Sequence, residues 1–109
     1  MEYEPNPSGG KAPPQYTMTL LKAVELGEYE PTVLSQWPEW HKLSHHGQFQ
    51  LVRKGLANKD FQLRSEWAEI NNQLNFSQKP YLQKALLSID KQIKDLRSEE
   101  DRLFVEFTK

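Results

Sequence analysis

Residues 81 to 107 read YLQKALLSIDKQIKDLRSEEDRLFVEF, and the spacing of apolar residues in this stretch decides the fold. One column recurs every seven positions: Leu82, Ile89, Leu96 and Leu103. A second column lies four residues further on: Leu86, Ile93, Glu100 and Phe107. Seven of these eight positions are apolar, and such spacing is typical of a coiled-coil helix that buries one stripe against another helix. We therefore expect a long helix over about residues 78 to 107.

A second long helix is expected just before it, over about residues 44 to 74. Its apolar residues also share one face, with a seven-residue column of their own: Phe49, Leu56, Leu63 and Ile70. Ser44 is well placed to cap the start of this helix, and Ser77 the start of the next. Only residues 75 to 77 separate the two helices, and a connection this short requires them to fold back antiparallel.

In an antiparallel pair, residues at the same level have numbers with a constant sum. A sum of 156 gives these pairs: Leu74 with Leu82, Ile70 with Leu86, Trp67 with Ile89, Leu63 with Ile93, Leu56 with Glu100 and Phe49 with Phe107. The match continues through Gly55, although glycine weakens a helix by about 1 kcal/mol relative to alanine. The sequence therefore predicts an all-α protein built on a long antiparallel helical hairpin.

Two carboxylates, Asp60 and Glu100, interrupt the apolar columns. Each has a candidate ion-pair partner on the opposite helix: Arg97 for Asp60 and Arg53 for Glu100. A charge paired within a helical seam fixes register at some cost in stability. Because no histidine lies near them in this alignment, we interpret them as determinants of register rather than as an acid/base or metal pair.

The first part of the chain reads differently. Residues 1 to 15, MEYEPNPSGGKAPPQ, hold four prolines and two glycines and little that is apolar, which predicts a disordered tail. Residues 16 to 109 are then one helical domain. Over residues 16 to 43 we expect short helices, because Gly27 and two proline-containing breaks divide this segment. Thr17 is the expected cap of the first of them.

Composition limits the classes of function. The chain has 109 residues, no cysteine and a net charge of -1, so disulfides, thiol catalysis and cysteine-ligated zinc are excluded. No apolar run approaches the roughly 18 residues of a membrane span, and no signal peptide is recognisable. The expectation is a cytoplasmic protein that binds no membrane.

A two-helix hairpin has one buried interface, so apolar residues off that interface need another cover. The residues concerned are Tyr81, Phe104, Val105 and Phe61. The short helices could pack on the open end of the hairpin, placing Trp37, Trp40 and Leu43 near Phe49, Phe104 and Phe107. Alternatively, two hairpins could pair into a four-helix bundle on dimerisation. The sequence permits both at once.

Four aromatic residues are the candidate partner-binding residues: Trp37, Trp40, Tyr81 and Phe104. Aromatic side chains commonly anchor protein interfaces. For the two tryptophans the competing interpretation is an aromatic cap on a small core, because aromatic residues supply much of the burial in small domains.

Three histidines and one repeat complete the candidates. His41 and His45 have the spacing that places two imidazoles on one helical face, but a helix boundary falls between them. We therefore interpret both, together with His46, as solvent-facing or capping residues, and we expect no metal and no cofactor. Residues 2 to 5, EYEP, recur as residues 28 to 31, either by coincidence or as two docking peptides for one partner.

These observations predict a non-enzymatic protein–protein interaction module, a small adaptor or regulatory subunit that presents helix faces and forms a homodimer. The alternative is a nucleic-acid-binding regulator that uses the basic side of the last helix: Lys79, Lys84, Lys91 and Lys94. A helix-turn-helix with its turn near Gly55 is a variant of this alternative. Neither half of the chain has the basic excess that binding of phosphate backbones requires.

The hairpin can be tested by replacing Leu63 and Ile93, which the constant sum places at one level, with cysteine. Since the chain has no other thiol, oxidation of Leu63→Cys/Ile93→Cys should close a disulfide within one chain. Non-reducing electrophoresis distinguishes this product from a cross-linked dimer. Cross-linking between chains instead would mean that the helices pair in trans.

Overall fold

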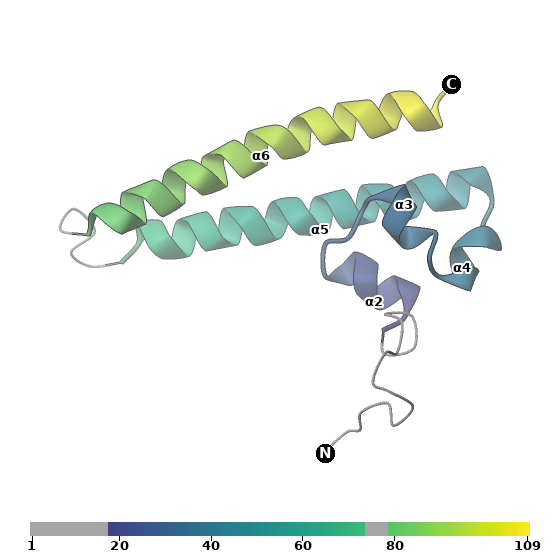
Figure 1. Cartoon of the computed structure of the whole chain (residues 1–109), viewed down its shortest axis with the longest axis horizontal. Helices are drawn as coiled ribbons and strands as arrows, with labels where there is room; N and C mark the ends of the chain where they lie inside the picture. The colour runs from purple at the N-terminus through teal and green to yellow at the C-terminus, as the bar shows by residue number, and fades with distance from the viewer. Residues whose placement is uncertain (1–17, 74–78) are drawn as a thin grey trace, which may run out of the picture.

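The computed structural model describes residues 18–73 and 79–109, and all regular secondary structure in these ranges is helical (Figure 1). The helices are α2 (Leu20–Glu25), α3 (Pro31–Leu34), α4 (Pro38–His41), α5 (His45–Asn71) and α6 (Pro80–Phe107). The expected all-α class and the two long helices are confirmed. The expected tail and the corner between the long helices lie outside the described residues, as do positions 17 and 77. The prediction that these two residues cap α2 and α6 is wrong, because the N-caps are Thr19 and Lys79.

Local sequence explains where the short helices begin and end. The Thr19 hydroxyl accepts a hydrogen bond from the amide of Lys22 at 3.1 Å and so caps α2. Gly27, just after α2, has a φ of 99°, a left-handed conformation that glycine adopts without strain. Pro31 and Pro38 each open a helix, in the first turn where a missing amide hydrogen costs little.

The long helices begin much as expected. The Ser44 hydroxyl accepts a hydrogen bond from the amide of Gly47 at 3.0 Å and caps α5. Helix α5 ends at Asn71, earlier than the expected residue 74, and α6 begins at Pro80 rather than 78. With 27 and 28 residues, each helix is about 40 Å long at a rise of 1.5 Å per residue.

Helices α5 and α6 pack side by side and run in opposite directions (Figure 1). The side chains buried along them come largely from the expected columns: Val52, Leu56 and Leu63 on α5, and Leu82, Leu86, Ile89, Leu96 and Leu103 on α6. At the open end, where α5 begins and α6 ends, the rings of Phe49 and Phe107 stack with centroids 5.3 Å apart. This is one of the pairs that a constant sum of 156 requires.

The expected ion pairs across the seam are wrong. Asp60 binds Arg64 on its own helix, whose Nε lies 3.0 and 2.9 Å from the two carboxylate oxygens, rather than Arg97. Glu100 is exposed, and the guanidinium of Arg53 lies over the ring of Phe49 instead. An arginine four residues along the same helix reaches a carboxylate without crossing the interface. Register in the helix pair therefore depends on the apolar columns.

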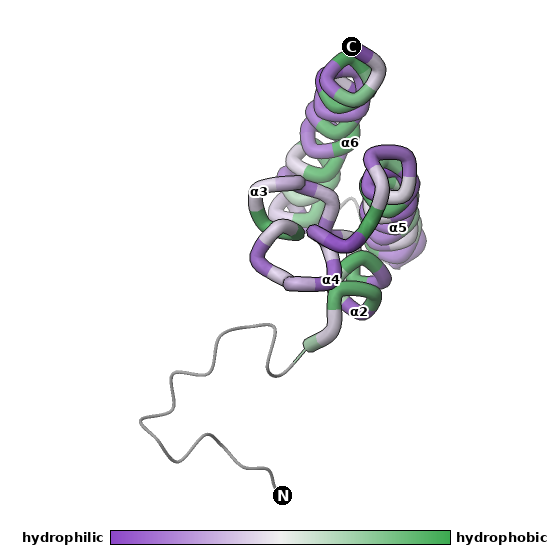
Figure 2. The backbone as a smooth tube through the Cα atoms, turned by 90° about the vertical axis from the view of Figure 1, so that its right-hand side faces the viewer, coloured by the Kyte–Doolittle hydropathy of each residue, from purple (hydrophilic) through white to green (hydrophobic). Residues whose placement is uncertain are grey.

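The short helices cover one side of the α5/α6 pair. Figure 2, a view rotated by 90°, shows α2, α3 and α4 all on the same side of the two long helices. They contribute Leu20, Ala23, Val24, Leu34, Trp37 and Trp40 to the same buried cluster as Val52, Leu56 and Leu103. On the opposite side of the pair, residues 18–73 and 79–109 form no such layer.

Side-chain amides of α5 fasten this layer. Asn58 donates to the carbonyl of Val24 at 2.9 Å, and Gln62 donates to that of Leu26 at 2.7 Å. Gln48 donates to the carbonyl of Trp40 at 2.9 Å. The accepting carbonyls lie at or just after the ends of α2 and α4, and two of them also accept a backbone amide from the turn that follows the helix. One face of α5 therefore forms side-chain hydrogen bonds with the ends of two short helices.

The closest approach occurs at Gly55, in the middle of this face. A Cβ at this position would overlap the carbonyl oxygen of Glu28 and would lie 3.1 Å from Cα of Tyr29. Although glycine lowers helix stability, Gly55 has a packing role: because it lacks a side chain, the backbone between α2 and α3 can lie directly against α5. The helix-turn-helix variant is wrong, because α5 continues through this residue.

Gly55→Ala should lower the free energy of unfolding by about 1–3 kcal/mol, because a methyl group forced into a packed backbone contact outweighs the gain in helix propensity. Urea denaturation followed by circular dichroism measures the change. Gly47→Ala is the matched control in the same helix. Its added Cβ would meet mainly the Ser44 hydroxyl, at 3.3 Å, so it should change stability much less. Equal stability of Gly55→Ala and the parent would contradict the packing argument.

Candidate interaction site

Aromatic rings pack together at the open end of the helix pair, where α5 begins and α6 ends. The ring of Phe49 lies between those of Phe107 and Phe104, with centroid distances of 5.3 and 6.1 Å. His45 adds a tilted contact with Phe107 at 5.1 Å. Its Nε2 lies 2.7 Å from the carbonyl oxygen of Phe107, the last residue of α6, and since a carbonyl only accepts, this nitrogen carries the hydrogen. His45 is thus a cap that joins the start of α5 to the end of α6.

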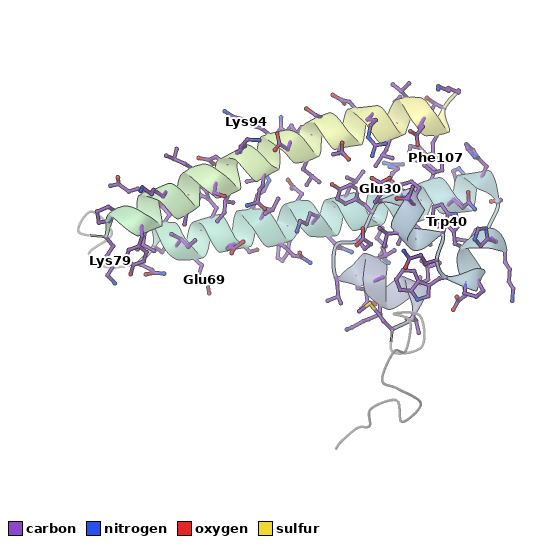
Figure 3. The ribbon with its side chains drawn as sticks, in the orientation of Figure 1. Glu30, Trp40, Glu69, Lys79, Lys94 and Phe107 are labelled. Atoms are coloured by element: carbon purple, nitrogen blue, oxygen red, sulfur yellow. The ribbon has the colours of Figure 1, made fainter. Side chains whose placement is uncertain are left out.

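Trp37 and Trp40 belong to the core and not to the surface. Their exposed fractions are only 3% and 5%. The indole nitrogen of Trp37 donates to the carbonyl of Met18 at 2.7 Å, which satisfies its polar atom inside the protein. Trp40 lies at the open end, where it lines a shallow depression together with Phe107 (Figure 3). The two tryptophans therefore offer a partner almost no surface, and we remove them from the candidate site.

Tyr81 and Phe104 are exposed, at 63% and 56%, but they belong to different surfaces. They lie 23 residues apart on α6, which separates them by about 34 Å along the helix and about 140° around it. Of the four candidate residues, Phe104 alone borders a groove between α5 and α6.

A groove runs between α5 and α6 on the side that the short helices leave uncovered. Its outer part, about 370 Å³, is lined by Phe49, Arg53, Leu56, Glu100, Asp101, Leu103 and Phe104. Its inner part, about 390 Å³, is lined by Leu56, Ala57, Asp60, Arg64, Leu96, Arg97 and Glu100. Leu56 and Glu100 border both parts, so the two depressions adjoin, and we call them together the α5/α6 groove.

The groove has an apolar floor and charged walls. Leu56, Leu96 and Leu103 are buried at its base. In the outer part the carboxylates of Glu100 and Asp101 outnumber Arg53, whereas in the inner part Arg64 and Arg97 are balanced by Asp60 and Glu100. The groove therefore carries charges of both signs along its whole length.

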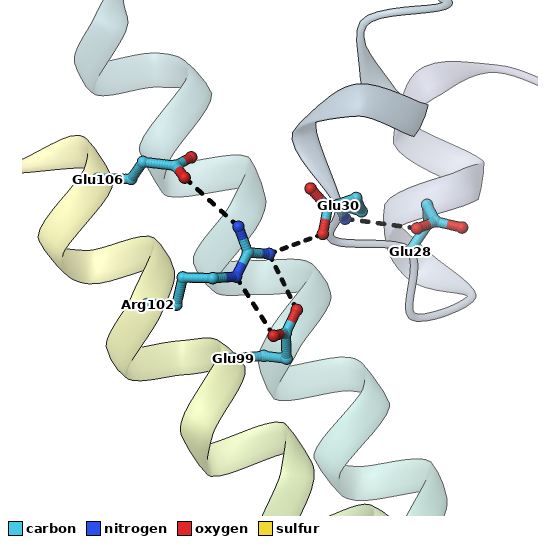
Figure 4. A network of polar contacts seen from close by, with 5 residues as sticks. All are labelled: Glu28, Glu30, Glu99, Arg102 and Glu106. Carbon is cyan, nitrogen blue, oxygen red and sulfur yellow. Dashed lines mark hydrogen bonds and ion pairs between the residues drawn. The ribbon is translucent and has the colours of Figure 1, made fainter.

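The opposite side of α6 carries a polar network around Arg102 (Figure 4). Arg102 Nη2 donates to Glu30 at 2.8 Å and to Glu99 at 2.9 Å, while Nη1 lies 3.4 Å from Glu106. The hydrogen bond to Glu99 raises the pKa of Arg102 further above its already high value. Since these side chains are partly exposed, the network contributes little stability by itself. Its effect is to hold the segment before α3 against α6.

The internal EYEP copy therefore has a structural role. The backbone of Glu28 and Tyr29 lies on Gly55, Glu30 binds Arg102, and Pro31 opens α3. The first copy, residues 2 to 5, lies outside the described residues.

The remaining candidates make local contacts. His41 Nε2 lies 2.8 Å from the carbonyl of Ser35, and His46 lies 3.2 Å from Gln50. Within residues 18–73 and 79–109, no three histidine, aspartate or glutamate side chains gather closely enough to hold a metal ion. On the basic side of α6, Lys91 is paired with Asp95 at 2.8 Å. Figure 3 shows Lys94 on the side of α6 that faces away from α5.

The sequence did not predict the groove and indicated only some of its residues. Arg53, Asp60, Arg97 and Glu100 were assigned to ion pairs inside the seam, whereas they line an open surface beside it. One signal was available. Positions 53, 57, 60 and 64 repeat at spacings of four and three, which marks a second stripe on α5 next to the apolar one.

Comparisons with family models, with curated proteins and with solved structures found no match to this chain. Among the described residues, no helix combines the length and apolar character needed to cross a bilayer. Function is therefore inferred from the chain's own surface.

Tyr29 provides a pH test of the packing around Gly55. Burial, followed by the charges of Glu99, Glu30 and Glu28, raises the pKa of its phenol above the usual 10.0. Well below pH 10 the phenol is neutral in both states. As pH rises further, the unfolded state loses the proton first, so stability is lost.

Tyr29→Phe should therefore show a smaller drop in urea midpoint than the parent between about pH 9 and about pH 11. Tyr81→Phe, which removes an exposed phenol, is the control and should behave like the parent. The same drop in all three proteins would contradict the burial of Tyr29.

Proposed function

We propose that this chain is a non-enzymatic protein–protein interaction module, a small adaptor or regulatory subunit that binds a helix in its α5/α6 groove. The observation that carries this proposal is the pair of adjoining depressions on the side of the two long helices that α2, α3 and α4 do not cover. Two packed helices with a layer on one side leave the other side free for a further helix.

The dimensions of the groove suit an amphipathic helix. From Phe49 to Arg64 the α5 wall covers 16 residues, about 22 Å or four helical turns. A helix with apolar residues at spacings of three and four would lay them on Leu56, Leu96 and Leu103. The charged walls would select partners and fix their direction more than they would add affinity.

The chemistry of the groove favours binding over catalysis. Its lining offers carboxylates and arginines but no serine, histidine or lysine, and Asp60 is already engaged with Arg64. A general base and a nucleophile within hydrogen-bond reach of one another are what a catalytic site would need.

The proposal is tested by comparing what three tagged proteins recover from cells that express the chain natively. Ala57→Glu puts a charge on the groove wall and should reduce recovery of specific partners at least about tenfold, equivalent to about 1.4 kcal/mol. Leu87→Glu is the matched control, since Leu87 is exposed and does not line the groove.

Circular dichroism should show that both variants keep the helical content and thermal midpoint of the parent. Recovery of the same partners by all three proteins, or of none by the parent, would contradict the groove as the binding surface.

A further inference from the structure

Charges on the two walls of the α5/α6 groove are arranged symmetrically about Ala57. On α5, Arg53 lies about one turn before Ala57 and Asp60 about one turn after it. On α6, Asp101 and Arg97 lie one turn apart, and the constant sum of 156 places their midpoint at the level of Ala57. These four residues thus place one positive and one negative charge on each wall, at similar distances from one level and in opposite order. Each wall has one further charge: Arg64 on α5, which pairs with Asp60 of its own helix, and Glu100 on α6.

We propose that the partner bound at this groove is a second copy of the chain, which binds through its own α5/α6 groove. This inference rests on the proposed function and names its partner. The two hairpins pair face to face and antiparallel, about a two-fold axis at the level of Ala57, which stacks α5 on α5 and α6 on α6. The result is a four-helix core with a layer of short helices on each outer side.

This arrangement brings opposite charges together. Reversal about Ala57 sets Arg53 beside Asp60 of the second copy, and Arg97 beside Asp101 of the second copy. Each pair occurs twice, because a two-fold interface uses the same patch on both subunits. The groove therefore supplies its own electrostatic complement.

Ala57 and Glu100 favour the antiparallel direction. A residue on the two-fold axis meets its own copy, so it must be small and uncharged for the helices to approach, and Ala57 is both. Glu100 lies close to Arg97 of the second copy in this direction. In a parallel pairing Glu100 would lie at the level of Leu56 of the second copy, an apolar residue that does not offset its desolvation.

A mixing experiment tests the charge pairs. Arg97→Asp alone and Asp101→Arg alone each place like charges together and should weaken self-association at least about tenfold. An equimolar mixture of the two variants should dimerise again, because each variant now complements the other. Sedimentation equilibrium gives the masses. A mixture that stays monomeric while the parent dimerises would overturn this pairing, and it is also the result expected of parallel hairpins.

A cross-link tests the axis. The chain has no cysteine, so Ala57→Cys introduces one thiol per copy, and two such thiols meet at the axis. Mild oxidation should yield a disulfide-linked dimer at least about tenfold faster than for Leu87→Cys, whose position is 68% exposed but outside the groove. Equal rates would overturn the proposed axis.

The mass of the parent chain in solution distinguishes failure of the self-pairing proposal from failure of the proposed function. A parent chain that is monomeric up to roughly 100 μM would overturn self-pairing. If that monomer still recovered partners in a manner sensitive to Ala57→Glu, the proposed function would stand and only its partner would change.

Discussion

The contact between Gly55 and the backbone of Glu28 and Tyr29 determines how the rest of this protein is arranged. Because residue 55 has no Cβ, the segment between α2 and α3 comes close enough to α5 for three side-chain amides to reach the ends of the short helices. The same segment carries Glu30 to Arg102 on α6. One short stretch is thus held by both long helices, so all three short helices lie on one side of the pair (Figure 2).

This placement creates the difference between the two sides of the hairpin. A pair of packed helices buries only one narrow stripe of apolar side chains, and a domain of this size buries a smaller fraction of its surface on folding than a larger domain does. The short helices widen the core with Leu34, Trp37 and Trp40, which are nearly inaccessible. On the other side no such layer is present among the described residues, and the floor of the groove is covered only at its edges. Stability and the candidate site therefore have a common origin in the one-sided layer.

The sequence predicts what is encoded locally or by a regular period. Seven-residue columns indicated the two long helices and the contact of Phe49 with Phe107, and single residues marked the cap at Ser44 and the end of α2 at Gly27. The role of Gly55 could not be predicted, because it depends on a segment 26 residues away that no periodicity links to it. The ion pairs were misassigned because pairing by level ignores an arginine one turn along the same helix.

Glu100 is the residue that the hairpin alone does not explain. It occupies a position of the apolar column in α6, yet it is exposed and takes part in no ion pair within the described ranges. An apolar residue at that position would bury more surface against Leu56, so a carboxylate weakens the helix pair. The charge makes physical sense if that wall of the groove meets a cation on another helix. Glu100 would then weaken the packing of α6 on α5 but contribute an ion pair to the interface with the partner.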